Sequence, residues 1–439
     1  MQSHLAQALV FVPTYSPEAM AVAGRSVAGV PPLVRSLMTL QLAGLENIVL
    51  LVAPDQKERV VQFLERYPER KLPQYTILCY DEPYCVSSPV LTQLEMLMAP
   101  QFLLMDTNLL FNAALAQNML KAPVSNTELV ELMDGVISLP CYTATSAIFP
   151  ELQKIVAQGV LSIEGCLRHL REHFKRKPLS NESAYSTFLL KRLNDIEVAE
   201  KFLCENLRLS THGIVAKHFN KRISLPMSLF FSKIWMKPNV ITSLNLFIGV
   251  MSGVFVANGR DPFAMLFGAF LFQLASVIDG CDGEVAKLTF RFSKYGGHFD
   301  TIVDYISLFA FIIGLIIGHW NATHSAWSFV ISGNLLLWVS AFLGLVIWVV
   351  RNNSRSASLI AFEQDFIDKL PSTYPAWVFW MLRTGKFFIK KDFFSLVAFV
   401  LALFGELFWW LYAANIMTMI GFFLVAYLVY REIGVAKRV

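Results

Sequence analysis

Charged side chains are scarce in this 439-residue chain: Asp, Glu, Lys and Arg make up only 16% of it, against 55% hydrophobic residues, and the mean hydropathy is +0.50. This composition excludes a disordered or collagen-like chain and is unusual for a purely soluble protein. An excess of charge of one sign is also lacking, because the formal net charge is only +4. We therefore expect no nucleic acid among the partners and predict a protein that lies at least partly in a membrane.

The sequence also lacks the patterns that mark a secreted or zinc-binding protein. Its six cysteines contain no Cys-x-x-Cys pair and stand at no zinc spacing from a histidine. We expect reduced thiols, with neither a disulfide framework nor a structural metal. The first apolar run, 8–13, is too short for the core of a signal peptide and follows no basic segment. The N-terminal part of the chain is therefore expected to stay in the cytosol.

An uneven distribution of charge divides the chain into parts. Charged residues recur every few positions up to about Lys237, and beyond it uncharged runs of about 17 to 25 residues repeat, long enough to cross a bilayer. We predict an α/β cytosolic domain over 1–204, an amphipathic juxtamembrane linker helix over 205–236, and an all-α six-helix transmembrane domain over 237–439.

Short apolar runs alternate with helical stretches in the first part. Two stretches have helical periodicity, 32–43 and 57–67. This alternation predicts a mostly parallel sheet. Because parallel sheets place ligands at the carboxyl ends of their strands, Asp106 is a candidate metal ligand or polar anchor. Four runs have the length and composition of buried strands: 8–12, 47–53, 75–80 and 102–106.

The segment GRSVAGVPPLVRSLMTLQLAGLENIVLLV (24–52) resembles the start of the sugar-phosphate nucleotidyltransferases, in which Gly-x-Pro-Leu and a later Ala-Gly precede a strand. The resemblance implies that Asp106 matches the family's metal-binding aspartate, and that the run beginning at Asp195 matches its closing segment. Where the family has a Gly-rich loop for the triphosphate, this chain reads VPTYSPEAM (12–20), whose prolines supply no N–H donors. We expect a degenerate, catalytically silent domain, with retained activity as the alternative.

Six membrane spans are readable in the last part of the chain. By the positive-inside rule, the cation-rich connections face the cytoplasm, which places both termini and the N-terminal domain on the cytoplasmic side of a cell inner membrane. Those connections, the 2-to-3 and 4-to-5 loops and the tail, hold thirteen Lys and Arg residues, whereas Arg260 alone lies on the opposite side. The spans run roughly over 240–257, 262–280, 299–318, 326–350, 393–412 and 414–430.

The stretch from Leu207 to Phe231 mixes cations with apolar residues. We predict an amphipathic helix at the membrane surface, whose cations attract anionic lipid headgroups. A specific role in binding a phosphorylated substrate is the alternative for Lys221 or Arg222. Lys390 and Lys391, further along the chain, can help to attract an anionic acceptor.

Four carboxylates stand within 26 residues at the boundary of the second and third spans: Asp279, Asp282, Asp300 and Asp304. Ionisable side chains at a membrane carry a high free-energy cost, so a purely structural role explains these four poorly. The members of each pair lie on one helix face, and two adjacent helices can therefore point all four into one site. Like charges so close require cations, and carboxylate-only ligation selects Mg²⁺ or Mn²⁺, of which we expect two. Phosphoryl chemistry is the natural inference.

The run from Asp279 to Asp304 resembles the signature of the CDP-alcohol phosphotransferase family, D-x-x-D-G-x-x-A-R, eight residues, G-x-x-x-D-x-x-x-D. Seven of the eight fixed positions match. The departure is Lys287, which stands where the family has Arg and keeps the charge without the bidentate fork. The family's fold, six transmembrane helices paired as a homodimer, agrees with the span count.

The resemblance implies a role for each matching residue. Asp279, Asp282, Asp300 and Asp304 would ligate the metals, and Asp304 would also be the general base that takes the proton of the acceptor hydroxyl. The family's P-N-x-x-T segment stands here with Asn239 and Thr242, which would contact the cytidine. For Asn239 the alternative is a helix N-cap. The residues that would line the CDP site are Gly283, Ala286, Lys287 and Gly296.

Together these resemblances predict an integral-membrane transferase that moves a substituted phosphate group from a CDP-alcohol to an acceptor alcohol with release of CMP, in phospholipid or inositol-phosphate type biosynthesis. The expected partners are the CDP-alcohol donor, an alcohol, phosphorylated-alcohol or lipid acceptor, membrane lipids and a second copy of the chain. The order of the parts resembles the bifunctional enzymes that join an inositol-phosphate cytidylyltransferase to a di-inositol-phosphate-phosphate synthase. Two alternatives stay open: a bifunctional enzyme that also makes the CDP-alcohol from CTP, and a non-catalytic scaffold or cation-binding transporter.

Overall fold

The computed structural model describes residues 7–12, 17–66, 72–80, 85–135, 137–157, 161–180, 187–211, 215–353 and 391–436. The chain divides into two compact units. The first comprises Met1–Ser210, Ser228–Met236 and Glu284–Phe292, and the second comprises Thr211–Met227, Lys237–Gly283 and Ser293–Val439. The first unit therefore contains the ends of two helices in addition to the N-terminal fold.

In the part of the chain that the structure describes, seven strands form the central sheet of the first unit, in the order β10-β7-β8-β5-β1-β2-β3. The four predicted strands are present and pair in parallel: β1 (Gln7–Phe11), β2 (Asn47–Val52), β3 (Gln74–Cys79) and β5 (Gln101–Asp106). Three strands were not predicted: β7 (Glu128–Asp134), β8 (Ile137–Thr145) and β10 (Lys175–Ser180). Within this sheet, β8 runs antiparallel to both of its neighbours, and the other pairs of neighbouring strands are parallel. The sheet is therefore mostly parallel, as expected.

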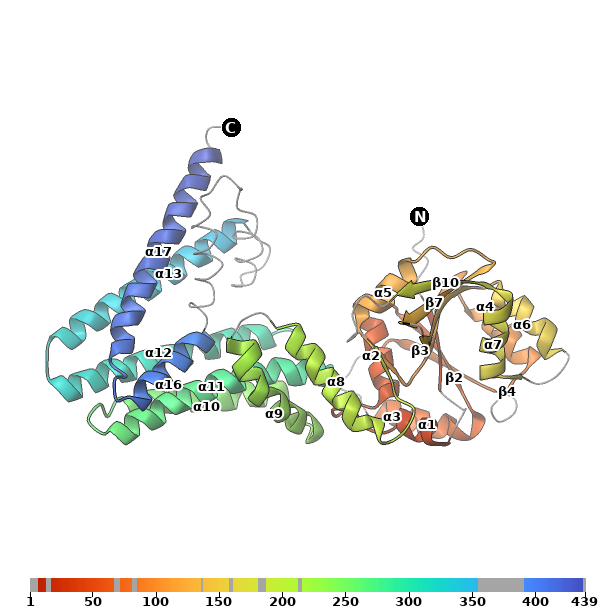
Figure 1. Cartoon of the computed structure of the whole chain (residues 1–439), viewed down its shortest axis with the longest axis horizontal. Helices are drawn as coiled ribbons and strands as arrows, with labels where there is room; N and C mark the ends of the chain where they lie inside the picture. The colour runs from red at the N-terminus through yellow and green to blue at the C-terminus, as the bar shows by residue number, and fades with distance from the viewer. Residues whose placement is uncertain are drawn as a thin grey trace. The chain divides into compact units, whose positions relative to one another are not determined.

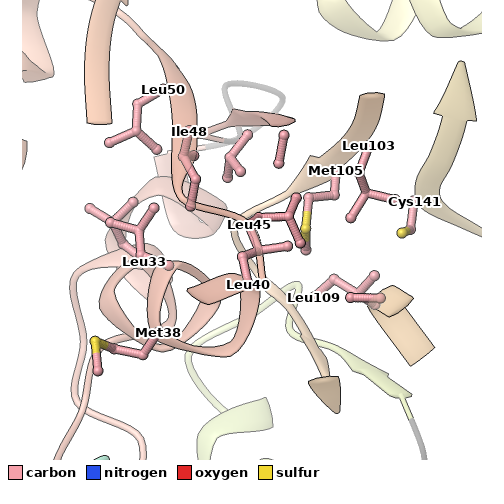
Figure 2. Packing of buried hydrophobic residues seen from close by; sticks show 14 of the residues in the cluster. Leu33, Met38, Leu40, Leu45, Ile48, Leu50, Leu103, Met105, Leu109 and Cys141 are labelled. Atoms are coloured by element: carbon pink, nitrogen blue, oxygen red, sulfur yellow. The ribbon is translucent and has the colours of Figure 1, made fainter. Parts of the chain in front are cut away.

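Helices cover both faces of this sheet. The apolar side of α2 is buried along most of its length, and Figure 2 shows Leu33 and Leu40 near side chains of β2 and β5. Each fully buried leucine contributes about 1.5 to 3 kcal/mol. One layer contains α2 (Pro32–Leu42), α3 (Lys57–Glu65) and α5 (Ala113–Lys121), and the other contains α4 (Ser88–Leu97), α6 (Ile148–Val156) and α7 (Ile163–His173).

Shorter elements complete the first unit. Two pairs of antiparallel strands lie outside the main sheet: β4 (Cys85–Val86) with β9 (Leu161–Ser162), and β6 (Leu109–Phe111) with β11 (Thr187–Leu189). The remaining helices are α1 (Pro17–Ala23), the single turn η1 (Pro54–Gln56) and α8 (Asp195–Leu209). Asp195 fixes the start of α8, because its carboxylate accepts the backbone N–H groups of Lys191 and Arg192 over 2.8 and 2.9 Å.

The predicted linker helix over 205–236 is not one helix. Residues up to Leu209 belong to α8, and the chain then forms the π-helical turn η2 (Ala216–Asn220) and α9 (Lys221–Lys233). Three serines recur at helical spacing on the buried side of α9: Ser224, Ser228 and Ser232. Residues 212–214 of the stretch predicted to be an amphipathic helix lie outside the described residues.

Helices make up the rest of the second unit. Helices α10 and α12 pack closely, and glycine at position 253 allows this approach. A Cβ at that position would lie 2.2 Å from the backbone oxygen of Ala310. Helices α13 and α17 also lie side by side (Figure 1). The helices are α10 (Pro238–Val256), α11 (Pro262–Thr289), α12 (Gly296–Thr323), α13 (Trp327–Asn353), α16 (Lys391–Leu403) and α17 (Trp409–Ala436).

Four helices among the described residues are long and apolar enough to cross a membrane: α10, α11, α12 and the Trp409–Tyr427 part of α17. Part of α13, Trp327–Phe342, is a shorter apolar helix. The continuous span predicted over 393–412 is wrong, because α16 ends at Leu403 and α17 begins at Trp409. Gly405 takes a left-handed conformation (φ +76°) between them, which ends the helix. Most of the cation-rich 4-to-5 loop, 354–390, lies outside the described residues, as do Lys437 and Arg438.

Candidate active site

Two helices carry the four predicted aspartates. Asp279 and Asp282 lie on α11, and Asp300 and Asp304 lie on α12. The carboxylates are close enough to interact across the helices: Asp279 with Asp300 and Asp304, and Asp282 with the same two residues. The structure therefore brings the four side chains of the signature together in the second unit.

Polar side chains on α10 hold two of these carboxylates. Thr242 Oγ1 donates a hydrogen bond to Asp282 Oδ2 over 2.5 Å, and Asn245 Nδ2 donates one to Asp279 Oδ1 over 2.8 Å. Both donors are buried, Asn245 with only 1% of its surface exposed. Sequence reasoning identified Thr242 but missed Asn245, although the spacing of three residues places both on one face of α10.

Lys391, the first residue of α16, brings a positive charge to the aspartates. Its Nζ pairs with Asp304 and lies 3.6 Å from Asp279 Oδ1, and its side chain is 14% exposed. The sequence assigned Lys391 only a general attraction for an anionic acceptor. Its contact with Asp304 could not be seen there, because the two residues are 87 positions apart.

A polar network fixes the residue beside this lysine. Asp392 Oδ1 accepts hydrogen bonds from Ser276 Oγ over 2.8 Å and from Asn220 Nδ2 over 3.0 Å. Gln273 Nε2 in turn donates to Asn220 Oδ1 over 3.2 Å. Because Ser276 and Gln273 lie on α11, the network ties the start of α16 to the helix that carries Asp279.

The donor chemistry of the site suits a hard divalent cation. The ligand atoms are carboxylate oxygens, the type that Mg²⁺ and Mn²⁺ prefer. Asp300 Oδ1 is buried and has no hydrogen-bond partner. In the described part of the chain, however, no group of three or more His, Cys, Asp or Glu side chains is arranged to enclose a metal ion. The residues thus fit a metal by donor type, with Lys391 providing positive charge in the present arrangement.

The other residues predicted for the CDP site are distributed along the same helices. A Cβ on Gly283 would meet nothing within 4 Å, so the space beside it is open. Gly296 begins α12, and the position of a Cβ there would lie 3.8 Å from Asn239 Oδ1. The N-cap of α10 is Lys237, so the alternative reading of Asn239 as a helix N-cap is wrong. Ala286 and Lys287 lie in the last turns of α11.

Asp106, predicted as a metal ligand or a polar anchor, is buried at the end of β5. Its side chain is 1% exposed, and its Oδ1 accepts a hydrogen bond from the backbone N–H of Asn108 over 2.8 Å. The carboxylate therefore holds the turn that follows β5. Residues 13–16 of the segment that replaces the Gly-rich loop lie outside the described residues, and α1 begins directly after them at Pro17.

All six cysteines are free thiols. Burial raises the pKa of Cys141 and of Cys166 to about 12. For Cys204 burial, with Glu284 and Glu200 adding to it, raises the pKa to about 11. Thiols with such pKa values hold almost no thiolate at neutral pH, which makes them poor nucleophiles and poor metal ligands.

Comparison with known proteins identifies the region that carries the site. Residues 235–420 match the family model described as CDP-alcohol phosphatidyltransferase. The Bifunctional IPC transferase and DIPP synthase of Aquifex aeolicus is 30% identical over 139 residues, 31% of this chain and 31% of that protein. The protein of the same name from Thermococcus kodakarensis is 36% identical over 93 residues, 21% of this chain and 20% of its own length. The CDP-diacylglycerol–serine O-phosphatidyltransferase of Helicobacter pylori is 34% identical over 74 residues, 17% of this chain and 30% of that enzyme.

The chain thus spans less than a third of the length of each of these curated relatives. Two solved structures also match part of the chain. The match to the 4-diphosphocytidyl-2C-methyl-D-erythritol synthase from Anaerococcus prevotii covers 46% of this chain and 99% of that protein, at 12% identity and a TM-score of 0.35. The match to the inositol-1-phosphate CTP transferase from T. maritima covers 46% of this chain and 98% of that protein, at 10% identity and a TM-score of 0.35. No conclusion about function follows at that identity and score.

The family match includes α10, α11 and α12, the helices that carry all four aspartates and the two side chains that hold them. The signature, the geometry and the family model therefore agree on one stretch of sequence. This stretch, residues 235–420, is similar to the CDP-alcohol phosphatidyltransferase family.

Proposed function

We propose that this chain is a membrane transferase that moves a substituted phosphate group from a CDP-alcohol to an acceptor alcohol and releases CMP. The observation that carries the proposal is the meeting of four aspartates from α11 and α12, at the spacing of the family's signature, within the region that the family model matches. The substrates belong to the classes used in phospholipid or inositol-phosphate type biosynthesis.

Asp279, Asp282, Asp300 and Asp304 are the proposed ligands of two Mg²⁺ or Mn²⁺ ions. Such ions, when bound, supply positive charge that stabilises the pyrophosphate and the leaving CMP. Thr242 and Asn245 orient two of the carboxylates through hydrogen bonds, and such partners of a ligand strengthen metal binding. The buried, unpartnered Asp300 Oδ1 supports the assignment, because a buried carboxylate oxygen needs a hydrogen-bond donor or a cation.

Asp304 is the proposed general base. Its carboxylate accepts the proton of the acceptor hydroxyl while the hydroxyl oxygen forms a bond to the β-phosphorus of the donor. The bond between that phosphorus and the bridging oxygen breaks, and CMP leaves with the bridging oxygen. Asp304 is 33% exposed, which allows an acceptor to approach it. Its ion pair with Lys391 must loosen when the acceptor binds.

The remaining predicted residues are assigned to the nucleotide. Gly283 and Gly296 let the donor approach the helix backbones, and the open space beside Gly283 supports this role. Lys287 attracts the pyrophosphate as a point charge. Ala286 leaves room beside it, and Asn239 contacts the cytidine. Thr242 is assigned to orienting Asp282 in addition to any contact with the nucleotide, because its hydroxyl already donates to that carboxylate.

We further propose six spans, in which α16 and α17 take the place of the spans predicted over 393–412 and 414–430. Both termini and the N-terminal domain lie on the cytoplasmic side of a cell inner membrane, and the protein is a homodimer. We also propose domain limits of 1–204, 205–236 and 237–439, with the middle stretch formed by the end of α8, η2 and α9 in place of one helix. Four candidate spans and the cation count of the loops support this arrangement. The acceptor is an alcohol, a phosphorylated alcohol or a lipid.

Release of CMP from a panel of CDP-alcohols tests the proposal. Purified full-length protein in lipid vesicles is incubated with CDP-diacylglycerol, CDP-inositol and CDP-glycerol, each with inositol phosphate, glycerol phosphate or serine as the acceptor. We expect CMP release with at least one pair, abolished by a chelator and by Asp304→Asn. The exposed Asp55→Asn is the matched control and should keep full activity. No CMP from any pair would contradict the proposal.

A bifunctional enzyme is the second candidate. The relatives named Bifunctional IPC transferase and DIPP synthase favour it, as does the mostly parallel α/β fold. The prolines at 13 and 17, in place of a Gly-rich loop, count against it. Incubation with CTP and inositol 1-phosphate separates the two candidates: pyrophosphate release supports the bifunctional enzyme, and its absence supports a degenerate domain.

A further inference from the structure

Arg35 of α2 is a buried cation that contacts a distant segment of the chain. It is 5% exposed, and its Nη2 donates to two backbone oxygens, that of Val27 over 2.8 Å and that of Leu288 over 2.9 Å. Leu288 belongs to the last turn of α11, 253 positions away in the sequence, and both residues lie in the first unit. A buried charge is costly unless its hydrogen bonds are made, so these contacts are central to the placement of Arg35.

The end of α11 is shaped around this arginine. Phe290 follows the helix in a left-handed conformation (φ +56°), and the N–H of Arg291 closes the last turn by donating to Ala286 O over 3.1 Å. The guanidinium of Arg35 lies over the Phe290 ring, 5.3 Å from its centroid. Arg35 thus contacts both a terminal carbonyl and the capping ring of one helix, where a positive charge is favourable.

Other contacts of the first unit hold the same region. Glu200 of α8 accepts the N–H of Ala28 over 3.1 Å and pairs with Lys233 of α9 over 2.7 Å. Gly29 has a left-handed conformation (φ +80°), and a Cβ there would lie 2.3 Å from Ser232 O, so the turn packs directly on the end of α9.

Arg291 joins the ends of the two helices. Its Nη1 donates to Trp235 O over 2.9 Å, and its guanidinium lies over the Trp235 ring at 4.8 Å. Trp235 is itself left-handed (φ +61°) and follows the end of α9. The ends of α9 and α11 are therefore capped together, and Arg35 attaches this pair to α2.

We propose that Arg35 is a positioning residue of the transferase, which holds the last turn of α11 so that Lys287 stays oriented for the pyrophosphate of the donor. Lys287 is the residue next to Leu288, whose carbonyl Arg35 binds. The inference rests on the proposed function, which assigns Lys287 to the nucleotide. It gives the N-terminal fold a part in the transferase reaction that requires no synthesis of a CDP-alcohol.

Steady-state kinetics of full-length protein in lipid vesicles tests the positioning role. Arg35→Met removes the donors and keeps most of the aliphatic volume, Arg35→Lys keeps the charge, and the exposed Arg59→Met on α3 is the matched control. We expect Arg35→Met to raise KM for the CDP-alcohol about tenfold, with kcat and the KM of the acceptor within about twofold. Arg35→Lys should lie between wild type and Arg35→Met. A role in folding alone would lower the active fraction, and so kcat, with no change in the donor KM.

Amide hydrogen exchange of residues 286–292 gives a readout that does not depend on activity. Arg35→Met should speed exchange of the Arg291 amide and leave the β5 amides unchanged, since their hydrogen bonds lie within the sheet. An unchanged exchange rate of the Arg291 amide would overturn the inference that Arg35 holds the last turn of α11. Faster exchange with an unchanged donor KM would overturn the positioning role.

A second variant covers the case in which Arg35→Met does not accumulate. Phe290→Leu removes the ring beneath the guanidinium and keeps both hydrogen bonds, so a smaller rise in donor KM, about twofold to threefold, is expected. An unchanged donor KM there would count against the proposal. If wild-type protein releases no CMP from any donor, the proposed function fails, whereas the exchange measurement still decides whether Arg35 holds the end of α11.

Discussion

Replacement of Lys391 by Met should make the stability of the protein depend strongly on divalent metal. The ammonium group pairs with Asp304 and lies 3.6 Å from Asp279 Oδ1. Without it, the acidic side chains of α11 and α12 lose the cation that the described residues place among them. A bound divalent ion can replace that charge, and Lys391→Met should therefore be tolerated in Mg²⁺ and damaging in a chelator.

The magnitude follows from the distances. At 3.6 Å and an effective dielectric constant of about 20, one ion pair is worth about 4 to 5 kcal/mol before the cost of desolvation. Removal of one partner of a buried pair typically costs about 3 to 5 kcal/mol. Because Asp304 is 33% exposed, solvent screens part of this effect, and we expect a loss of about 2 to 3 kcal/mol in the chelator. That corresponds to a fall in Tm of about 5 to 10 °C.

Thermal unfolding of purified protein in detergent, followed by tryptophan fluorescence, measures the effect. Wild type and Lys391→Met are compared in a chelator and in saturating Mg²⁺, with the exposed Lys57→Met as the control. We expect the large fall in Tm only for Lys391→Met in the chelator. An equal fall in both buffers would show that Lys391 stabilises α16 independently of the acidic site, and no fall in either would refute the ion pairing.

Three further results are expected. Thr242→Val removes the hydrogen bond to Asp282, and since such a bond to a charged group is worth about 1.5 to 3 kcal/mol, the Mg²⁺ concentration for half-maximal CMP release should rise at least tenfold. Lys287→Arg restores the fork of the signature and should lower the donor KM about threefold or more; an increase would contradict the role assigned to Lys287. Burial raises the pKa of Cys141 and Cys166 to about 12, so each is about one part in 10⁴ thiolate at pH 8, and mass spectrometry should find both unmodified by iodoacetamide until the protein is unfolded.

The part of the sheet that could be predicted is the part built from continuous apolar runs. The strands β1, β2 and β5 were found because buried parallel strands consist largely of Val, Ile and Leu. The strand β3 was found as well, but its predicted burial is wrong, because it lies at an edge of the sheet and its residues are exposed or half-buried. The missed strands lack that composition: β8 contains Pro140 and two threonines, and β10 reads KRKPLS. Since β10 is at the edge of the sheet, it can carry charges and a proline that a central strand would exclude.

The part of the candidate site that could be predicted is the pair of aspartates on each of two helices, because their spacing in the sequence determines which helix face they share. The intervals between the aspartates place each pair on one helix face, and the structure brings them together. The parts supplied by other helices could not be found in this way. Asn245 is one polar residue in an apolar helix, and Lys391 stands in a stretch of mixed basic and aromatic residues, where nothing in the sequence shows that it contacts Asp304. The helix break at Gly405 was missed because the stretch on both sides of Gly405 and Glu406 is apolar and hydropathy does not detect a turn.

Whether the N-terminal fold uses CTP and whether Arg35 positions the end of α11 are linked questions, because both concern the same segment. The segment that resembles the start of the nucleotidyltransferases, 24–52, is the one in which Arg35 binds Leu288 O and Gly29 packs on Ser232. A CTP bound with help from Arg35 would therefore have to displace these contacts. If the protein releases pyrophosphate from CTP and Arg35→Met abolishes that release while exchange at the end of α11 stays normal, Arg35 is a nucleotide ligand. If there is no such release and Arg35→Met raises only the KM of the CDP-alcohol, the segment has become a support for the helix that carries Lys287.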